Sequence, residues 1–545
     1  MGTTYNLVCT VLILFASLLS RFIYPSRLMR LVAAGWTAIS VRPWVAIVAV
    51  AALAALVCAG LSLRGWHYPG THDEFGYLLT AETFTLGRLT NPTPTSWIHF
   101  ESIHIIVQPS YTAKYPPGQS VFLALGWALF GHPMFGVYIS FILACAAICW
   151  MLQAWLPPRW SFAGGVLAVL LFGTTDWANS YWGGAVAALG GALVFGSMRR
   201  LVKDQAVGSG IALGVGLAIL ANTRPYEGLV VSVLALLVLA GHAIANRTLW
   251  TPPFLLKVAL PVVLVLAPTA AAMACYNHAV TGDALRMPYR VHDDTYAAAP
   301  TFLWQPPKSA PAYNHDAMRD YYVGHELPRY LQKCAHCGFD QSLGTKLYMF
   351  AKFYVTPLLV IPWGFMIWRI RDGWWRFALV TCAILLLALT QTLYLFPHYA
   401  APATGLLVGL NVQAIRYCRQ WKLFGARAGA CYTAGIFGAL GLGVILFCCQ
   451  PEQVPPRGTI EARLAEIPGR HLVFVHYVEG HDAHDEWVYN SANLSSARVI
   501  WARELGASAN EKLIAELSGR IVWIVTVGSP TAPSDLQRYD RTLVR

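Results

Sequence analysis

The stretch GTHDEFGYLL, residues 70–79, places two adjacent carboxylates, Asp73 and Glu74, shortly after a long apolar run. That run, residues 43–63, is long enough to cross a bilayer as a helix, which takes about 20 apolar residues. Acidic residues just beyond such a run have two explanations. They either stabilise the start of a helix at the membrane edge, or they carry out chemistry there.

The composition indicates a membrane protein. The chain has 545 residues, of which 56% are hydrophobic and only 12% are charged, and its mean hydropathy is +0.49. A soluble globular protein carries about 25% charged residues. The net charge of +12 does not favour nucleic-acid binding, because the basic residues lie in short loops between apolar runs.

Apolar runs predict a polytopic α-helical membrane protein with about 11–12 transmembrane helices. The predicted spans are 5–23, 43–63, 132–155, 160–175, 183–199, 209–222, 227–245, 254–276, 347–369, 376–395, 398–415 and 428–449. The spans 160–175 and 209–222 are short. The N-terminal segment 5–23 lacks the basic start and the cleavage site of a signal peptide, so it is expected to span the membrane or to lie in its interface.

The basic residues predict the orientation of these spans. With twelve spans every basic cluster falls on one side, which the positive-inside rule makes cytoplasmic. The clusters are Arg21, Arg27, Arg30 and Arg42; Arg199, Arg200 and Lys203; Arg247; Arg369, Arg371 and Arg376; and Arg416, Arg419, Lys422 and Arg427. Three large segments then lie outside the cytoplasm, namely 64–131, 277–346 and 450–545.

The last segment differs in composition from the rest of the chain. It is more charged and has no membrane stretch, while HLVFVHY and IVWIVTV are typical of buried strands and NEKLIAELSG of a helix that ends at glycine. We therefore expect a small α/β soluble domain at 450–545. The predicted organisation is an extra segment and basic loop at 1–42, a membrane domain at 43–449, and this domain outside the cytoplasm.

The opening stretch has helical spacing. Asp73 and Tyr77 are four residues apart and share a helix face, and Thr71 followed by Glu74 matches a capping box. Further along, KYPPG precedes an apolar helix of about a dozen residues that is too short to span the membrane. Lys114 stands directly before these prolines. A lysine there either snorkels into solvent or holds a lipid phosphate.

These features together resemble the GT-C membrane glycosyltransferases, over residues 43–415. The carriers of the resemblance are the Asp-Glu pair with its tyrosine after a span, the KYPPG turn, the short helix and the many spans that follow. The branch most similar holds protein O-mannosyltransferases and lipid A aminoarabinose transferases. The N-terminal segment and the soluble tail lie outside the resemblance.

The resemblance implies roles for individual residues. Asp73 matches the catalytic carboxylate, Glu74 its neighbour, and Lys114 the basic residue that contacts the donor phosphate. It implies a sugar donor on a polyprenyl-phosphate carrier, no nucleotide sugar at the site, inversion at the sugar, and transfer on the outer face. A carboxylate base speeds attack by a hydroxyl ~10²–10⁴-fold, and a cation stabilises the leaving phosphate.

Further residues are candidates for binding the substrates. Arg224 and Glu227 lie at the outer end of a span, where they either form an interfacial ion pair or Arg224 holds phosphate. Weaker candidates lie in other outer turns: Tyr115; Asp176, Tyr181 and Trp182; Arg286, Tyr289 and Arg290; and His398 with Tyr399. The belt aromatics at 174–184 are more simply explained by the membrane interface, and segment 277–346 is expected to form a flexible cover.

Two motifs invite a metal interpretation. Cys334 and Cys337 form one CxxC without a second, so a disulfide is favoured over free thiols or a metal site. The tail sequence HYVEGHDAHDEW, 476–487, is rich in histidine and carboxylates, yet its spacing fits a solvated loop better. No metal or cofactor is predicted, although a divalent cation is left open.

The sequence thus predicts an enzyme of the bacterial inner membrane with its active site and C-terminal domain in the periplasm. Its partners are a polyprenyl-phosphate-linked sugar, a lipid, glycan or protein acceptor, and membrane lipids, without nucleic acid. The main alternative is a transporter or scramblase of lipid-linked sugars. Transporters favour paired repeats with polar residues at mid-membrane, and neither feature is found here. A polymerase or ligase that uses lipid-diphosphate glycans is a second alternative.

Overall fold

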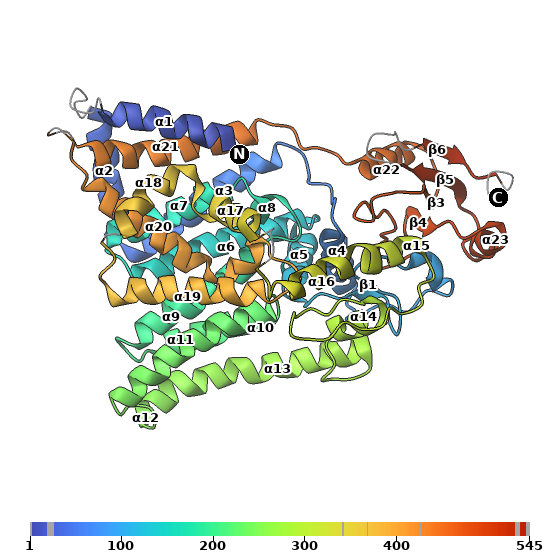
Figure 1. The fold of residues 1–545 in the computed structure, drawn as a ribbon, viewed down its shortest axis with the longest axis horizontal. Helices are drawn as coiled ribbons and strands as arrows, with labels where there is room; N and C mark the ends of the chain where they lie inside the picture. The colour runs from blue at the N-terminus through green and yellow to red at the C-terminus, as the bar shows by residue number, and fades with distance from the viewer. Residues whose placement is uncertain are drawn as a thin grey trace.

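A computed structural model describes residues 3–18, 27–339, 343–367, 369–423, 425, 427–528 and 535–540. A helical bundle forms one end of the molecule, a small α/β domain the other, and the outer loops lie between them (Figure 1). The bundle consists of α1 (Thr3–Leu18), α2 (Arg27–Ser40), α3 (Pro43–Ser62), α6 (Met134–Gln153), α7 (Pro158–Phe172), α9 (Ala185–Leu201), α10 (Val207–Ala221), α11 (Pro225–Ala245), α12 (Pro252–Phe254), η3 (Leu255–Ala259), α13 (Leu260–Thr281), α17 (Leu343–Tyr354), α18 (Thr356–Ile367), α19 (Gly373–Thr390), α20 (Thr404–Arg419) and α21 (Ala428–Cys448).

Helices occupy the predicted span positions, and the polytopic helical fold class is confirmed. Six helices in the described part of the chain are long and apolar enough to cross a membrane: α3, α6, α11, α12–α13, α19 and α21. Shorter apolar helices include α1, α7 and α10. The count of eleven or twelve spans therefore stays a prediction for the shorter helices. The segment 19–26, which includes the end of the first predicted span, lies outside the described residues.

The predicted span at 347–369 is broken in the structure. The helices α17 and α18 meet there at an angle of 93°. The break falls at Thr356, which has a φ of +55° and precedes Pro357. Proline disfavours the helical conformation of the residue before it and donates no backbone hydrogen bond, so the helix cannot continue straight through this point. If the pair crosses the membrane as one broken span, the count by length and composition rises to seven.

Small residues let the helices approach closely. A Cβ added at Gly126 in α5 (Gly118–Phe130) would lie 2.0 Å from the backbone nitrogen of Gly136 in α6. One added at Gly191 in α9 would lie 1.8 Å from the carbonyl oxygen of Pro402. Only glycine fits these crossings, which is the packing expected where lipid supplies no hydrophobic drive between helices.

The outer elements gather at the end of the bundle that faces the α/β domain (Figure 1). The first loop forms α4 (His72–Thr85), η2 (Trp97–Phe100), β1 (Ile105–Ile106), β2 (Thr112–Ala113) and α5 (Gly118–Phe130). The second forms α14 (Pro288–Tyr296), α15 (Asp316–Arg319), η4 (Asp320–Glu326) and α16 (Leu327–Ala335). Two short turns, α8 (Asp176–Asn179) and η5 (Pro397–Ala403), complete this end. The helix predicted after KYPPG is α5, and α12 lies at the opposite end of the bundle.

The C-terminal segment forms the expected α/β unit. It contains α22 (Pro456–Glu466), β3 (His471–Tyr477), β4 (Val499–Arg503), α23 (Ala507–Glu516), β5 (Ile521–Val527) and β6 (Asp535–Arg538). The sheet order is β4-β3-β5-β6, with β3 parallel to β4 and β5, and with β6 antiparallel to β5. Both strand segments and the helix expected from the sequence are present.

This domain is docked on the first outer loop. Phe100 of η2 packs into the hydrophobic cluster on one face of the sheet. The guanidinium of Arg503 donates a hydrogen bond to the carbonyl oxygen of Glu101 at 2.8 Å and forms an ion pair with Glu486 at 2.5 Å. His99 contacts the carbonyl oxygen of Arg503 at 2.8 Å. The domain therefore contributes to the surroundings of α4.

Candidate active site

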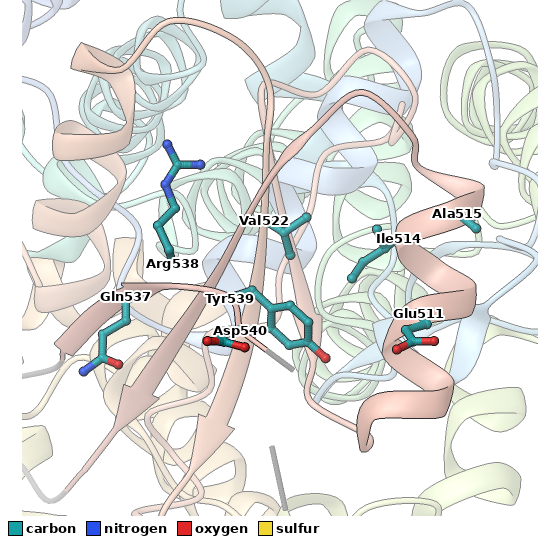
Figure 2. A pocket seen from close by; sticks show the side chains of 8 residues that line it. All are labelled: Glu511, Ile514, Ala515, Val522, Gln537, Arg538, Tyr539 and Asp540. Carbon is teal, nitrogen blue, oxygen red and sulfur yellow. The ribbon is translucent and has the colours of Figure 1, made fainter. Parts of the chain in front are cut away.

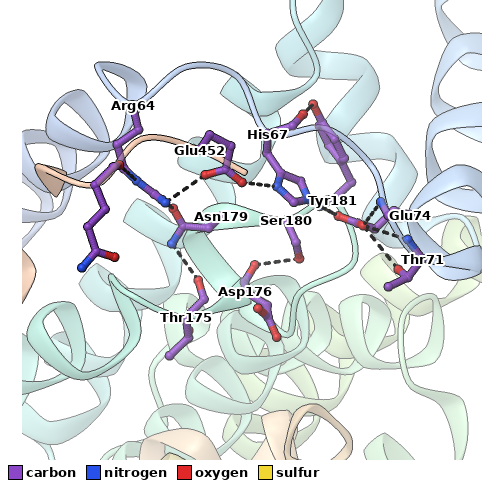
Figure 3. Close-up of polar contacts among 12 residues, drawn as sticks. Arg64, His67, Thr71, Glu74, Thr175, Asp176, Asn179, Ser180, Tyr181 and Glu452 are labelled. Atoms are coloured by element: carbon purple, nitrogen blue, oxygen red, sulfur yellow. Dashed lines mark hydrogen bonds and ion pairs between the residues drawn. The ribbon is translucent and has the colours of Figure 1, made fainter. Parts of the chain in front are cut away.

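The start of α4 is fixed by Glu74 rather than by both members of the acidic pair. Thr71 takes the extended N-cap conformation, and the capping box expected from the sequence is present. The Glu74 carboxylate accepts hydrogen bonds from the backbone N–H of Gly70 at 2.9 Å, of Thr71 at 3.3 Å and of Tyr181 at 3.1 Å (Figure 3). Both carboxylate oxygens are thereby engaged, and the residue is 2% exposed.

His67 links this helix cap to the start of the C-terminal segment. Its Nε2 lies 2.7 Å from Glu74 and its Nδ1 lies 2.8 Å from Glu452, which also pairs with Arg64 at 3.0 Å (Figure 3). Burial alone would lower the pKa of His67, but its hydrogen bonds to Glu452 and Glu74 outweigh burial and raise the pKa to about 9. The imidazole is therefore charged at neutral pH and holds two carboxylates together.

Asp73 takes no part in this network. Its carboxylate is half-buried on a different face of α4 and accepts a hydrogen bond from the Tyr115 hydroxyl. Gly76 makes room for this contact, because a Cβ there would lie 3.1 Å from the Tyr115 ring. Burial raises the pKa of Asp73, while the Tyr115 hydrogen bond and the charges of Lys114 and Arg224 oppose the rise. The two adjacent acids thus have separate surroundings.

Two cations lie near Asp73, and neither has a carboxylate partner among the residues that the structure describes. Lys114 follows β2, and its ammonium lies 5.8 Å from the ring centre of Tyr115 and 5.6 Å from that of Tyr289. Arg224 is the N-cap of α11, and its guanidinium lies 4.7 Å from the ring centre of Tyr399. Within the described ranges neither side chain forms an ion pair within 4 Å. The Arg224–Glu227 ion pair considered from the sequence is therefore not formed.

Tyrosines surround this group. Tyr77 and Tyr115 stack at 4.7 Å, and Tyr289 packs edge-on against Tyr115 at 5.8 Å. His398 lies at the margin, 4.5 Å from the ring of Trp182 and 4.6 Å from that of Tyr399. The structure thus brings together most of the residues expected from the sequence: Asp73, Tyr77, Lys114, Tyr115, Arg224, Tyr289 and Tyr399.

Sequence reasoning missed a layer of imidazole and phenol rings next to Asp73. His72 lies 5.5 Å from the ring of His104 and 5.5 Å from that of Tyr321, and His104 lies 5.8 Å from His292. Burial lowers the pKa of His72 to about 3 and that of His292 to about 4, so these rings are neutral. His104 has a φ of +68°, a strained backbone that no sequence pattern announces.

The second outer loop also brings a buried carboxyl toward the site. Glu326 in η4 accepts a hydrogen bond from Tyr394 at 2.9 Å, and burial raises its pKa to about 7. No sequence pattern around this single glutamate in a polar loop indicates that its carboxyl is buried. Its burial follows from the packing of η4 and is seen only in three dimensions.

The remaining predicted sites lie elsewhere. Arg286 pairs with Asp294 at 2.9 Å on the surface, and Arg290 is exposed. Asp176 begins the short helix α8, beside the Glu74 network (Figure 3). These positions favour a structural role for the three residues over a part in a reacting centre.

The predicted disulfide between Cys334 and Cys337 is wrong. Both are free thiols. Cys334 sits in the last turn of α16 with its Sγ 3.6 Å from the carbonyl oxygen of Leu303, while Cys337 is exposed in a turn with a φ of +51°. Their side chains are directed to different surroundings. Among the residues that the structure describes, no group of three or more His, Cys, Asp or Glu side chains is arranged to hold a metal ion.

Two hollows differ in their relation to Asp73. A narrow pocket of about 20 Å³ adjoins Lys114 and is otherwise mostly apolar, with Pro116, Met273, Met287 and Tyr289 in its wall. A larger open hollow of about 980 Å³ lies on the C-terminal domain between α23 and β6, lined by Glu511, Val522 and Tyr539 among others (Figure 2). It contains no residue of the Asp73 group, so size does not locate the site.

Fold and site define a multi-pass helical membrane protein with a carboxylate, two cations and several tyrosines gathered at one end of the bundle. No family model and no curated protein matches the sequence. Among solved structures, the chain is similar to ArnT from Cupriavidus metallidurans in the apo state, with 12% identity, a TM-score of 0.49, and coverage of 91% of this chain and 93% of that one.

Two further structures are similar. ArnT from the same organism bound to undecaprenyl phosphate matches with 12% identity and a TM-score of 0.49, over 88% of this chain and 92% of that one. The Archaeoglobus fulgidus oligosaccharyltransferase in the apo form matches with 9% identity and a TM-score of 0.44, over 88% and 69%.

Proposed function

We propose that this protein is a membrane glycosyltransferase that moves a sugar from a polyprenyl-phosphate carrier to a hydroxyl group of an acceptor. The observation that carries the proposal is the grouping of Asp73 with Lys114 and Arg224 among tyrosines at one end of the bundle. Transfer from a phosphate to a hydroxyl group needs a base for the hydroxyl and positive charge for the leaving phosphate, and here a carboxylate lies beside two cations that form no ion pair within the described residues. The site faces the periplasm in this proposal.

Asp73 is the general base. A carboxylate whose pKa is raised by burial is better matched to accepting a proton near neutral pH. The Tyr115 hydroxyl holds one of its oxygens, which leaves the other to meet the acceptor hydroxyl. One base acting in a single displacement inverts the sugar carbon. Glu74 supports this chemistry indirectly, because its carboxylate fixes the first turn of α4.

Lys114 and Arg224 bind the carrier phosphate. Neither cation is neutralised by a carboxylate within 4 Å in the described part of the chain, so each retains its charge for an anionic ligand. Half-buried Tyr289 and Tyr399 offer ring faces and hydroxyls to the sugar, with His398 at the edge, and the buried stack of Tyr77 and Tyr115 supports them.

Binding of undecaprenyl phosphate to the purified protein tests the phosphate site. We expect Lys114→Met and Arg224→Met each to weaken binding by at least tenfold, because each removes one charged contact to the phosphate. Undecaprenol, which lacks the phosphate, should bind weakly to the wild type and equally to both variants. Equal binding of undecaprenyl phosphate by the wild type and both variants would place the phosphate elsewhere.

A further inference from the structure

One loop of the C-terminal domain, residues 487–492, presses on the back of the helix that carries Asp73. The Tyr489 ring stacks on Phe75 of α4, with ring centres 4.4 Å apart and planes within 3°. The Tyr489 hydroxyl lies 2.8 Å from Nδ1 of His72, also on α4, and donates to the carbonyl oxygen of Ile103 at 3.1 Å. The N–H of Ala492 donates to Glu82, near the end of α4, at 2.7 Å.

This loop is itself held rigidly by the rest of its domain. The Arg457 guanidinium donates to the carbonyl oxygens of Trp487 at 3.0 Å and Tyr489 at 2.9 Å. The Asn490 side chain exchanges two hydrogen bonds with the backbone of Trp501 in β4, each of 2.8 Å. Tyr489 is 4% exposed and Arg457 8% exposed. The loop is therefore fixed to the sheet, so a shift of the C-terminal domain would also move the loop against α4.

The contacts lie on one side of α4 and the reacting carboxylate on another. His72, Phe75 and Glu82 are spaced by three and seven residues, so they share one face of the helix. Asp73 and Tyr77 lie on an adjoining face, which meets Tyr115. A side-chain tip stands about 5–6 Å from a helix axis, so a rotation of about 10° moves a carboxylate by about 1 Å.

We propose that the C-terminal domain positions the catalytic helix and that Tyr489 is its main positioning residue. The hydroxyl of Tyr489 donates to Ile103 and therefore accepts the Nδ1–H of His72, which ties the first turn of α4 to the chain before β1. The stacked ring fixes the next turn through Phe75. Together they set the rotation of α4 and with it the place of Asp73. This inference rests on the proposed transferase function.

The test compares Tyr489→Phe with Ser96→Ala in the full chain. Tyr489→Phe keeps the stacked ring and removes only the hydroxyl. Ser96→Ala removes one hydrogen bond of the same domain interface, the 2.6 Å bond to Glu516, at a point outside α4. A misplacement of about 1 Å costs up to about 100-fold in rate. We expect Tyr489→Phe to lower kcat at least tenfold with the donor KM within twofold, and Ser96→Ala to leave both within twofold.

Hydrogen exchange gives a second measurement that does not depend on activity. The amides of residues 75–85 should exchange faster in Tyr489→Phe than in the wild type, and at the wild-type rate in Ser96→Ala. Unchanged kcat and unchanged exchange in Tyr489→Phe would overturn the positioning role, as would equal effects of the two substitutions. Exchange could still rise only in Tyr489→Phe while the wild type transfers no sugar. In that case Tyr489 does hold α4 in place, and the transferase proposal fails.

Discussion

The adjacent acids Asp73 and Glu74 should respond in opposite ways to the loss of charge. Glu74→Gln keeps the size of the side chain but leaves one acceptor oxygen where the carboxylate has two. Oε2 accepts from the N–H groups of Gly70 and Thr71, while Oε1 accepts from Tyr181 N–H and faces His67. With the NH₂ at the Oε2 position, the N–H groups of Gly70 and Thr71 and the Thr71 hydroxyl lose their acceptor. With the NH₂ at the Oε1 position, the N–H of Tyr181 loses its acceptor, while a neutral His67 ring can accept from the amide.

The size of the effect follows from these contacts. A buried donor left without an acceptor costs about 1–3 kcal/mol, and at least one backbone donor loses its acceptor in either orientation, so the free energy of unfolding should fall by at least about 1–3 kcal/mol. Asp73→Asn retains an oxygen to accept the Tyr115 hydroxyl and removes a charge that burial disfavours. Its free energy of unfolding should therefore stay within about 1 kcal/mol of the wild type.

Equilibrium unfolding in mixed micelles, followed by tryptophan fluorescence, measures both variants against the wild type. Sugar transfer per folded molecule is measured on the same preparations. We expect Glu74→Gln to lose stability and to retain more transfer than Asp73→Asn, which should lose transfer and retain stability. The reasoning is refuted if Glu74→Gln is as stable as the wild type, or if Asp73→Asn is the less stable of the two.

Three further predictions concern other parts of the molecule. The pKa of His67 is about 9 in the folded protein against an ordinary 6.5, so its contribution of at most about 3 kcal/mol is complete below pH 6.5 and is lost as the pH rises through 9. The melting temperature of the wild type should fall over that range more steeply than that of His67→Gln, and parallel curves would contradict this. Gly126→Ala should lower the melting temperature because its Cβ would overlap the backbone of Gly136, whereas Gly131→Ala, which has open space but a φ of +78°, should lower it less. Exposed Cys337 should react with a maleimide without prior reduction, and a requirement for reductant would restore the disulfide.

Much of the fold could be predicted from the sequence because lipid imposes simple rules on it. Long apolar runs mark the helices, and the switch to alternating apolar residues after 450 marks the sheet. The break at Thr356 also has a cause in the sequence, because Thr356 precedes a proline. The long apolar run around it nevertheless predicts one continuous span. Local pattern thus predicts elements better than the angles between them.

The site was predicted only in part. The motif around Asp73 and the KYPPG turn led to Asp73, Lys114 and Tyr115, because these residues lie in short stretches with a recognisable order. The separate roles of Asp73 and Glu74 depend on His67, Tyr181 and Glu452, which come from distant segments. No local pattern links such residues.

The same limit applies to the layer of imidazole and phenol rings and to the contacts of loop 487–492 with α4. His104 reaches His72 through a strained backbone, and Tyr489 reaches α4 across more than 400 residues of chain. Contacts of this kind follow from tertiary packing and not from spacing along the sequence.

Sugar transfer by the wild type and by Asp73→Asn tests the central claim most directly. Both proteins are reconstituted at equal folded amounts and supplied with extracted polyprenyl-phosphate sugars, and Asp316→Asn, a carboxylate whose side chain is 89% exposed, serves as the control. We predict transfer by the wild type and the control, and a loss of at least about 100-fold in Asp73→Asn. Transfer by Asp73→Asn at the wild-type rate, or movement of intact lipid-linked sugar across the membrane without any transfer, would contradict the account.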